Sequence, residues 1–294
     1  IEFCEHALRY LQLVSQDFFI AETCQFYAES YSTLGSDVDV SSEERRKFLR
    51  KAVEVGRKGL EHAKRSGSPD ALGSTLHALS KALHLYSNFE TGTTAKRRLL
   101  EEALLHRKEY IKVVETAFSS NDWLGGVGKN YEGLIKTDLA GIETESDKTR
   151  TLLESAISDT EEGLSHCRKL ITTNPVPPLL TAIGAFEDGF GRVLNELYLL
   201  TEDKEILCRS IKAYEDAADD FKKADLPSRV AESHWKMARN QDRLSEHLKA
   251  AKSVENALAE LSNPRSFWGA LAKVVADYGL QVVYSPNTMH SAFF

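Results

Sequence analysis

Small residues recur in the same helical context along this chain of 294 residues, at intervals of roughly 40 to 54 positions. A period of that length is typical of stacked helical pairs, in which each pair buries its apolar face only against its neighbours. Such arrays usually bind other molecules and seldom catalyse reactions. The recurring positions are Ala52, Ala103, Ala156, Ser210 and Ala250. Seven residues after each of them stand Gly59, Tyr110, Gly163, Ala217 and Ala257.

Apolar residues elsewhere step by three and four, which is the periodicity of an amphipathic helix. A glycine inside a helix costs about 1 kcal/mol relative to alanine. We therefore expect Gly56, Gly59 and Gly163 to mark places where two helices approach closely. Tyr110 breaks the small-residue rule, so its junction should be wider or packed differently. The pattern predicts an all-α fold of about five antiparallel helical pairs.

The repeat array is expected to span residues 1–262, with a bend at 172–178, where three prolines interrupt the helical pattern. A C-terminal helix and an irregular tail follow over 263–294. Apolar residues stay clustered in that helix beyond the end of the array, which leaves self-association through it open as an alternative, structural role. These residues are Phe267, Trp268, Leu271 and Val274.

Charge and composition exclude several classes of function. The net charge of -7 argues against a general nucleic-acid binder. No apolar run approaches the roughly 18 residues of a membrane span, and the first residues do not read as a secretory signal. Because the chain starts at Ile1, we expect a fragment or a processed form.

The cysteines indicate a reducing compartment. Cys24, Cys167 and Cys208 fall on apolar helical faces, where a free cysteine packs as a small hydrophobe. No Cys-x-x-Cys pair occurs, so neither a zinc site nor a disulfide framework is expected. We expect a cytoplasmic protein without a metal or a cofactor.

The last helical pair carries a resemblance to a known family. Over Leu226 to Leu261, Met237-Ala238 in the first helix and an alanine–apolar–alanine series in the second resemble the tetratricopeptide repeat. That series is Ala250, Val254 and Ala257. The other units are longer than in the family, so the chain resembles a long-helix variant, such as the arrays that form scaffold or sensor arms of signalling proteins.

The resemblance implies a right-handed superhelix whose first helices line a concave groove for a partner segment. In the best-matching unit it places Glu232, Trp235, Arg239 and Asp242 toward the groove. Some family members hold a terminal carboxylate with a lysine and asparagine clamp. Trp235 and Arg239 occupy those places here, so that clamp is not reproduced.

One helix carries the most site-like cluster of the sequence. It combines an aromatic ring with cationic and amide donors at helical spacing, a mixture that is enriched at binding hot spots. We predict that this helix contacts an acidic partner segment; the alternative is a solvated helix face with one packed tryptophan. The cluster consists of Trp235, Lys236, Arg239, Asn240 and Arg243.

Two further groups could extend the same groove. Lys129 and Asn130 flank the apolar stripe of one first helix, and Arg192 and Asn195 flank that of the next. Ordinary surface charge is the alternative for both groups.

Two patterns that can signal metal or phosphate binding are incomplete. His77 and His84 lie seven residues apart, whereas two ligands on one helix usually lie three or four apart. The glycine-rich stretch 125–129 lacks the full spacing of a phosphate loop and the Ser or Thr that follows it. We expect its glycines to loosen the start of a helix.

A catalytic alternative rests on one motif. Arg229 and His234 are separated by four residues, as in the helical ribonucleases of the higher eukaryote and prokaryote nucleotide-binding family. Val230 stands where those enzymes usually have a polar residue, and an Arg–His pair at this loose spacing also arises by chance. We therefore predict a non-enzymatic scaffold or sensing arm that binds a protein or peptide.

Overall fold

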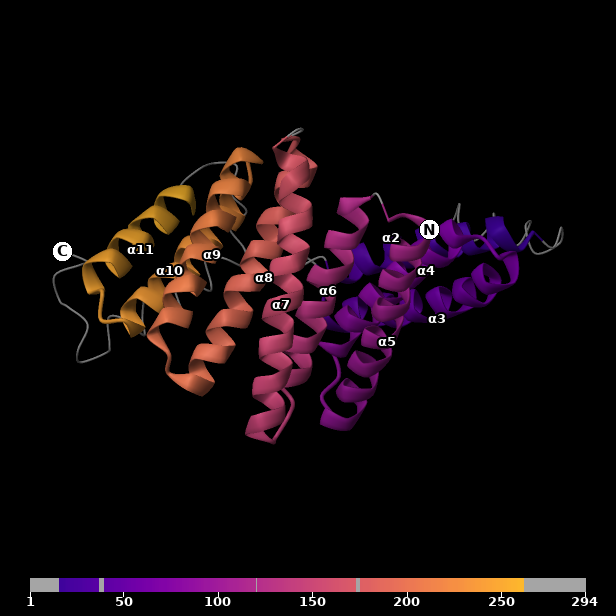
Figure 1. Cartoon of the computed structure of the whole chain (residues 1–294), viewed down its shortest axis with the longest axis horizontal. Coiled ribbons are helices and arrows are strands. Elements are labelled where there is room, and N and C mark those ends of the chain that lie inside the picture. Colours follow the sequence, from indigo (N-terminus) through magenta and orange to yellow (C-terminus); the bar gives the residue numbers. More distant parts are fainter. Residues whose placement is uncertain (1–15, 37–39, 120, 173–174, 262–294) are drawn as a thin grey trace. The chain divides into compact units, whose positions relative to one another are not determined.

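The computed structural model describes residues 16–36, 40–119, 121–172 and 175–261. These ranges contain ten α-helices and no strand (Figure 1). They form five successive pairs, as the period predicts: α2 with α3, α4 with α5, α6 with α7, α8 with α9, and α10 with α11. The predicted all-α helical-repeat fold is confirmed.

The chain divides into two compact units, and the boundary between His166 and Cys167 falls inside α7. The predicted bend at 172–178 lies a few residues beyond it, and the predicted segment 263–294 lies outside the described residues. Unit 1 contains α2 (Asp17–Ser36), α3 (Ser42–Ser66), α4 (Pro69–Ser87), α5 (Thr93–Ala117), α6 (Asp122–Ala140) and most of α7 (Ser146–Ile171). Unit 2 contains the end of α7, α8 (Pro177–Thr201), α9 (Lys204–Lys223), α10 (Pro227–Arg243) and α11 (His247–Leu261).

Side-chain caps fix where several helices begin. The hydroxyl of Ser41 accepts the backbone N–H of Glu44 at the start of α3, and Ser68 does the same for Ala71 at the start of α4. Such bonds satisfy donors that would otherwise lack a partner in the first helical turn. Gly67 ends α3 in the left-handed conformation, with a φ of 67°. The turn between these pairs is thus specified by its own residues.

The recurring small residues lie where helices touch. Four of the five first positions are completely buried, and Ala250 is nearly so. At Gly59 an added Cβ would lie 2.7 Å from the Cβ of Cys24 on α2. At Gly163 it would lie 2.8 Å from the carbonyl oxygen of Gly126 on α6. The predicted close approach is confirmed at both glycines, because neither position leaves room for a methyl group.

At the Tyr110 junction the large residue is on α5 and the small residue that makes room for it is on the neighbouring helix, α6. Tyr110 is buried on α5, and its phenol donates to the carbonyl oxygen of Leu124 at 3.2 Å. The space for its ring comes from Gly128 on α6, where an added Cβ would lie 3.1 Å from the ring. In unit 2 a glycine also makes room for a tyrosine, Gly191 on α8 for Tyr214 on α9, here within one helical pair. The junction is packed differently, as the sequence predicts, and Gly128 of the α6 glycine run serves packing.

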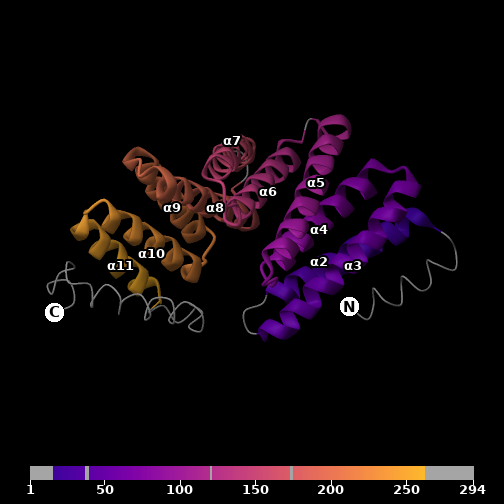
Figure 2. The ribbon, with the colours of Figure 1, turned by 90° about the horizontal axis from the view of Figure 1, so that it is seen from below.

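Ion pairs repeat with the period of the array. Arg57 pairs with Glu102 at 2.7 Å, 45 residues apart, and joins the second helices α3 and α5. The imidazole of His62 bonds Asp17 at 2.6 Å across 45 residues, and that of His166 bonds Asp122 at 2.6 Å across 44. Equivalent positions in the first and third pairs therefore make equivalent contacts. Figure 2 shows α10 and α11 of unit 2 side by side.

Two observations bear on the cellular setting. Cys24 and Cys167 are buried, as predicted, but Cys208 is exposed, so its predicted place on an apolar face is wrong. On α9 it is the preceding residue, Leu207, that is buried in the core. None of the described helices is both long and apolar enough to cross a membrane.

Candidate functional site

The predicted α10 cluster is partly buried. Trp235 is only 4% exposed, so the expectation that it faces a groove is wrong. Its helix packs against both α9 and α11, and Trp235 belongs to that packed side. Asn240 is also buried, and its amide donates to the Ser210 hydroxyl at 2.9 Å, which donates in turn to the carbonyl oxygen of Gly191 at 2.6 Å. Trp235 and Asn240 thus hold α10 in the array.

The cationic members of the cluster make contacts within unit 2. The ammonium of Lys236 lies 2.8 Å from the Asp188 carboxylate and 2.7 Å from that of Glu232. Arg243 donates to the side-chain oxygen of Asn195, which brings together two residues that the sequence assigns to one groove. Arg192 and Arg239 are partly exposed. Binding of an acidic segment here stays a prediction, although internal acids already accompany Lys236.

The second predicted group lies in unit 1 and is also engaged internally. Asn130 is completely buried, contrary to a role on the surface, and its amide donates to the carbonyl oxygen of Gly126 at 2.8 Å. Lys129 lies 3.1 Å from Glu162. Burial works to lower the pKa of Lys129, but the bond to Glu162 and the charges of Glu162, Asp159 and Glu132 together outweigh it, so the pKa is raised. This group stabilises the α6–α7 pair.

Arg229 and His234, the residues of the ribonuclease alternative, both lie on α10. The guanidinium of Arg229 bonds Glu232 at 2.8 Å and lies over the ring of Phe221, 4.9 Å from its centroid. Burial lowers the pKa of His234, and its buried Nδ1 has no hydrogen-bond partner in the described ranges. Arg229 is therefore occupied by a neighbouring carboxylate.

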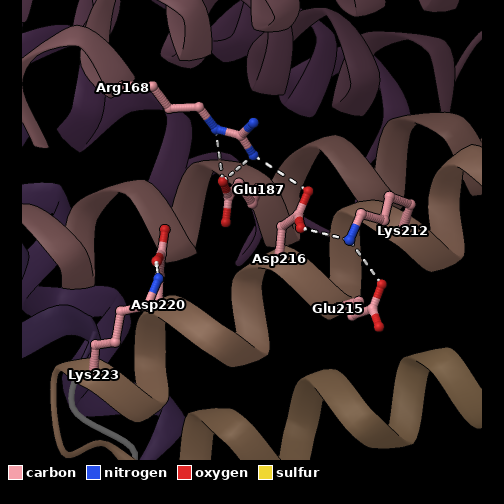
Figure 3. A network of polar contacts seen from close by, with 7 residues as sticks. All are labelled: Arg168, Glu187, Lys212, Glu215, Asp216, Asp220 and Lys223. Atoms are coloured by element: carbon pink, nitrogen blue, oxygen red, sulfur yellow. Dashed lines mark hydrogen bonds and ion pairs between the residues drawn. The ribbon is translucent and has the colours of Figure 1, made fainter. Parts of the chain in front are cut away.

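A network that the sequence did not reveal joins three helices of unit 2 (Figure 3). Arg168 at the end of α7 bonds Glu187 of α8 and lies 3.4 Å from Asp216 of α9, which also contacts Lys212 at 3.1 Å. Glu187 is 1% exposed, and its second oxygen has no hydrogen-bond partner among the described residues. Burial raises the pKa of Glu187 to about 7, because the nearby Arg168 only partly offsets the loss of water.

Unit 1 contains a cavity of ≈ 320 Å³, here called the unit 1 pocket. The first helices α2, α4 and α6 contribute most of its wall, and α5 and the residue that follows it contribute the remainder. Three aromatic side chains, three aliphatic ones and several polar groups line this pocket. Its lining consists of Glu29, Asp70, Gly73, Ser74, His77, Tyr110, Val114, Phe118, Trp123, Leu124 and Val127.

A buried arginine stands behind this lining. Arg107 is completely buried, and its guanidinium lies 5.1 Å from the centroid of the Tyr110 ring and 4.8 Å from that of Tyr131. In the part of the chain that the structure describes, no carboxylate forms an ion pair with Arg107 and its Nε atom makes no hydrogen bond, although the charge of Glu132 also favours the charged guanidinium. Burial lowers the pKa of Arg107 to about 10, which leaves it charged at neutral pH. The two π faces partly take the place of a counter-ion.

Arg107 sets the state of His77. Its Nη1 lies 3.0 Å from the Nδ1 of His77, and because a guanidinium can only donate, that ring nitrogen accepts. The proton of the neutral ring is then on Nε2. Burial, and after it the charges of Arg107 and Lys81, hold the pKa of His77 well below its usual value. The pocket therefore presents a neutral imidazole. His84, which stands seven residues after His77, bonds Asp138 at 2.6 Å.

Comparisons with known proteins do not assign the chain to a family. No protein-family description matches it, and no curated protein sequence does. Among solved structures, BtubC (BKLC) from P. vanneervenii is 16% identical, with a TM-score of 0.49 over 100% of this chain and 95% of that one. A de novo designed helical repeat protein is 14% identical, with a TM-score of 0.37 over 72% of this chain and 97% of its own. The helical-repeat assignment rests on the helices themselves.

Proposed function

We propose that this chain is a protein-binding module without catalytic activity, in which a partner segment lies along the first helices and anchors in the unit 1 pocket. The observation that carries the proposal is the pocket itself. Tyr110, Phe118 and Trp123 surround a cavity large enough for one partner side chain. Aromatic side chains that line a pocket are the commonest anchors of protein interfaces.

The tetratricopeptide resemblance supports the same side of the array. In that family the first helices line the surface that takes up a partner, and here α2, α4 and α6 contribute most of the pocket wall. No cofactor enters this function. We also propose a cytoplasmic location, which the wide spacing of the four cysteines in the sequence and the lack of a Cys-x-x-Cys pair support.

Ser74 offers a direct test, because it lines the pocket and, among the described residues, its hydroxyl bonds only to the backbone of its own helix. Ser74→Phe should fill the pocket with a ring, whereas Ser74→Ala removes the same hydroxyl and leaves the pocket open. Wild type and both variants would be used to capture proteins from a source lysate, with quantitation by mass spectrometry. We expect a set of proteins retained by Ser74→Ala and lost from Ser74→Phe.

Equal capture by all three proteins would overturn the proposal. Circular dichroism and thermal unfolding of Ser74→Phe would establish that its loss of binding does not reflect loss of the fold.

A further inference from the structure

The ionised side chains that line the unit 1 pocket are both acidic. They are Glu29 of α2 and Asp70 in the first turn of α4. Glu29 accepts a bond from the neutral amide of Gln25 at 2.7 Å, and neither carboxylate makes an ion pair within the described ranges. At the first turn of a helix the backbone dipole favours a carboxylate but carries only about half a unit charge. Negative charge is therefore left over at the pocket.

The positive groups nearby do not line the cavity. Arg107 lies behind Tyr110, and Lys81 is on α4 beyond His77, so neither contributes an atom to the lining. Their charges act on His77, whose lowered pKa keeps the imidazole neutral at physiological pH. An entering group thus meets two carboxylates and an uncharged ring.

The walls suit a long side chain with a charged end. Tyr110, Phe118 and Trp123 contribute aromatic rings to the lining, and three aliphatic residues contribute further apolar surface. The methylene stem of lysine or arginine packs on such walls while its charged head reaches a polar end. Cations are also attracted to aromatic faces, by about 0.5–2 kcal/mol depending on exposure. The three aliphatic residues are Val114, Leu124 and Val127.

We propose that the unit 1 pocket binds a lysine or arginine side chain of the partner segment, with the aliphatic stem against the aromatic wall and the cationic head at Glu29 and Asp70. This deepens, and rests on, the proposed protein-binding function. It assigns a basic partner to unit 1, in contrast to the acidic partner predicted for the α10 cluster in unit 2. A glutamate side chain would be repelled by the two carboxylates, and an apolar one would remove water from them without compensation.

The test uses the full chain and a panel of blocked pentapeptides, acetyl-Ala-Ala-X-Ala-Ala-amide. X is lysine, arginine, norleucine, glutamine or glutamate. The indole N–H resonance of Trp123, assigned with Trp123→Phe, reports occupancy of the pocket. Lysine and arginine peptides should shift it saturably and at least tenfold more tightly than norleucine, which has a similar stem without the charge. The glutamate peptide should cause no shift.

Charge-matched variants locate the site of recognition. Glu29→Gln with Asp70→Asn should weaken binding of the lysine peptide at least tenfold. Glu22→Gln with Glu101→Gln makes the same change in net charge on α2 and α5 but leaves the pocket lining intact, so binding should stay within twofold of wild type.

Three results would overturn the inference: norleucine binding as tightly as lysine, tighter binding of glutamate, or no shift with any peptide at 10 mM. The lysate capture with Ser74→Phe separates these from a failure of the proposed function. Partners lost from Ser74→Phe together with no preference for lysine would leave the binding module and remove only its basic ligand. Equal capture together with a preference for lysine would remove the proposed role of the pocket in partner capture and leave only its affinity for a basic side chain.

Discussion

Replacing Glu187 with glutamine should remove a pH-dependent loss of stability from unit 2. The pKa of Glu187 is raised from 4.5 to about 7, mainly by burial. The folded chain therefore holds this proton more tightly than the unfolded chain does. The corresponding contribution to stability is complete below about pH 4.5 and is lost as the pH rises through 7.

The magnitude follows from the size of the change in pKa. At about 1.4 kcal/mol for each tenfold change in proton affinity, full deprotonation costs about 3 kcal/mol of folding free energy. Between pH 5 and pH 8.5, the range of a practical titration, the expected loss is about 2.5 kcal/mol. A glutamine is neutral throughout this range. Asp216, which lies 3.4 Å from Arg168, remains in the variant as an acidic neighbour of the guanidinium.

The assay is the free energy of unfolding from urea titrations at several pH values. The difference between Glu187→Gln and wild type should grow in favour of the variant by about 2.5 kcal/mol from pH 5 to pH 8.5. Glu215→Gln is the matched control, because Glu215 belongs to the same network through Lys212 but its side chain is 52% exposed. Parallel pH curves for wild type and Glu187→Gln would refute the reasoning, and so would an equal change in Glu215→Gln.

Three further predictions concern packing and the C-terminal segment. Gly163→Ala should destabilise the chain by about 1–3 kcal/mol, because the new Cβ would lie 2.8 Å from a backbone oxygen of α6. Gly125→Ala, with nothing within 4 Å, should instead stabilise it by up to about 1 kcal/mol; similar urea midpoints for the two variants would contradict this. Ser210→Ala should cost about 1–3 kcal/mol in the same assay by leaving the buried Asn240 amide without its acceptor, and an unchanged midpoint would argue against the relay. Removal of 263–294 should leave binding of the lysine peptide intact; light scattering on the same sample tests self-association, which a change from dimer to monomer would support.

The sequence predicted the helices and their small contact positions because both depend on local periodicity. Ala52 and Gly163 mark a buried stripe by spacing alone, and their contacts confirm it. Trp235 was assigned to the wrong side, because α10 has apolar residues on the sides that face both α9 and α11, and spacing does not say which side the ring enters.

The unit 1 pocket could not be read from the sequence for a different reason. Its lining comes from four helices, and Glu29 lies about 90 residues before Trp123. Neither acid stands beside an aromatic residue of the pocket in the sequence. Arg107 sits in a run of ordinary helix-surface charges, and only packing reveals that it is completely buried.

The exchange of sizes at Tyr110 and Gly128 has an evolutionary consequence. The spacing between two helices depends on the combined volume of the residues that meet there, and either helix can supply the bulk. Paired substitutions can therefore move the large side chain from one of two contacting helices to the other without changing the distance between the helices. In unit 2, Gly191 on α8 likewise makes room for the ring of Tyr214 on α9, here within one helical pair. Methods that compare sequences one column at a time would see the motif disappear at such junctions, whereas the sum of the two volumes would stay nearly constant.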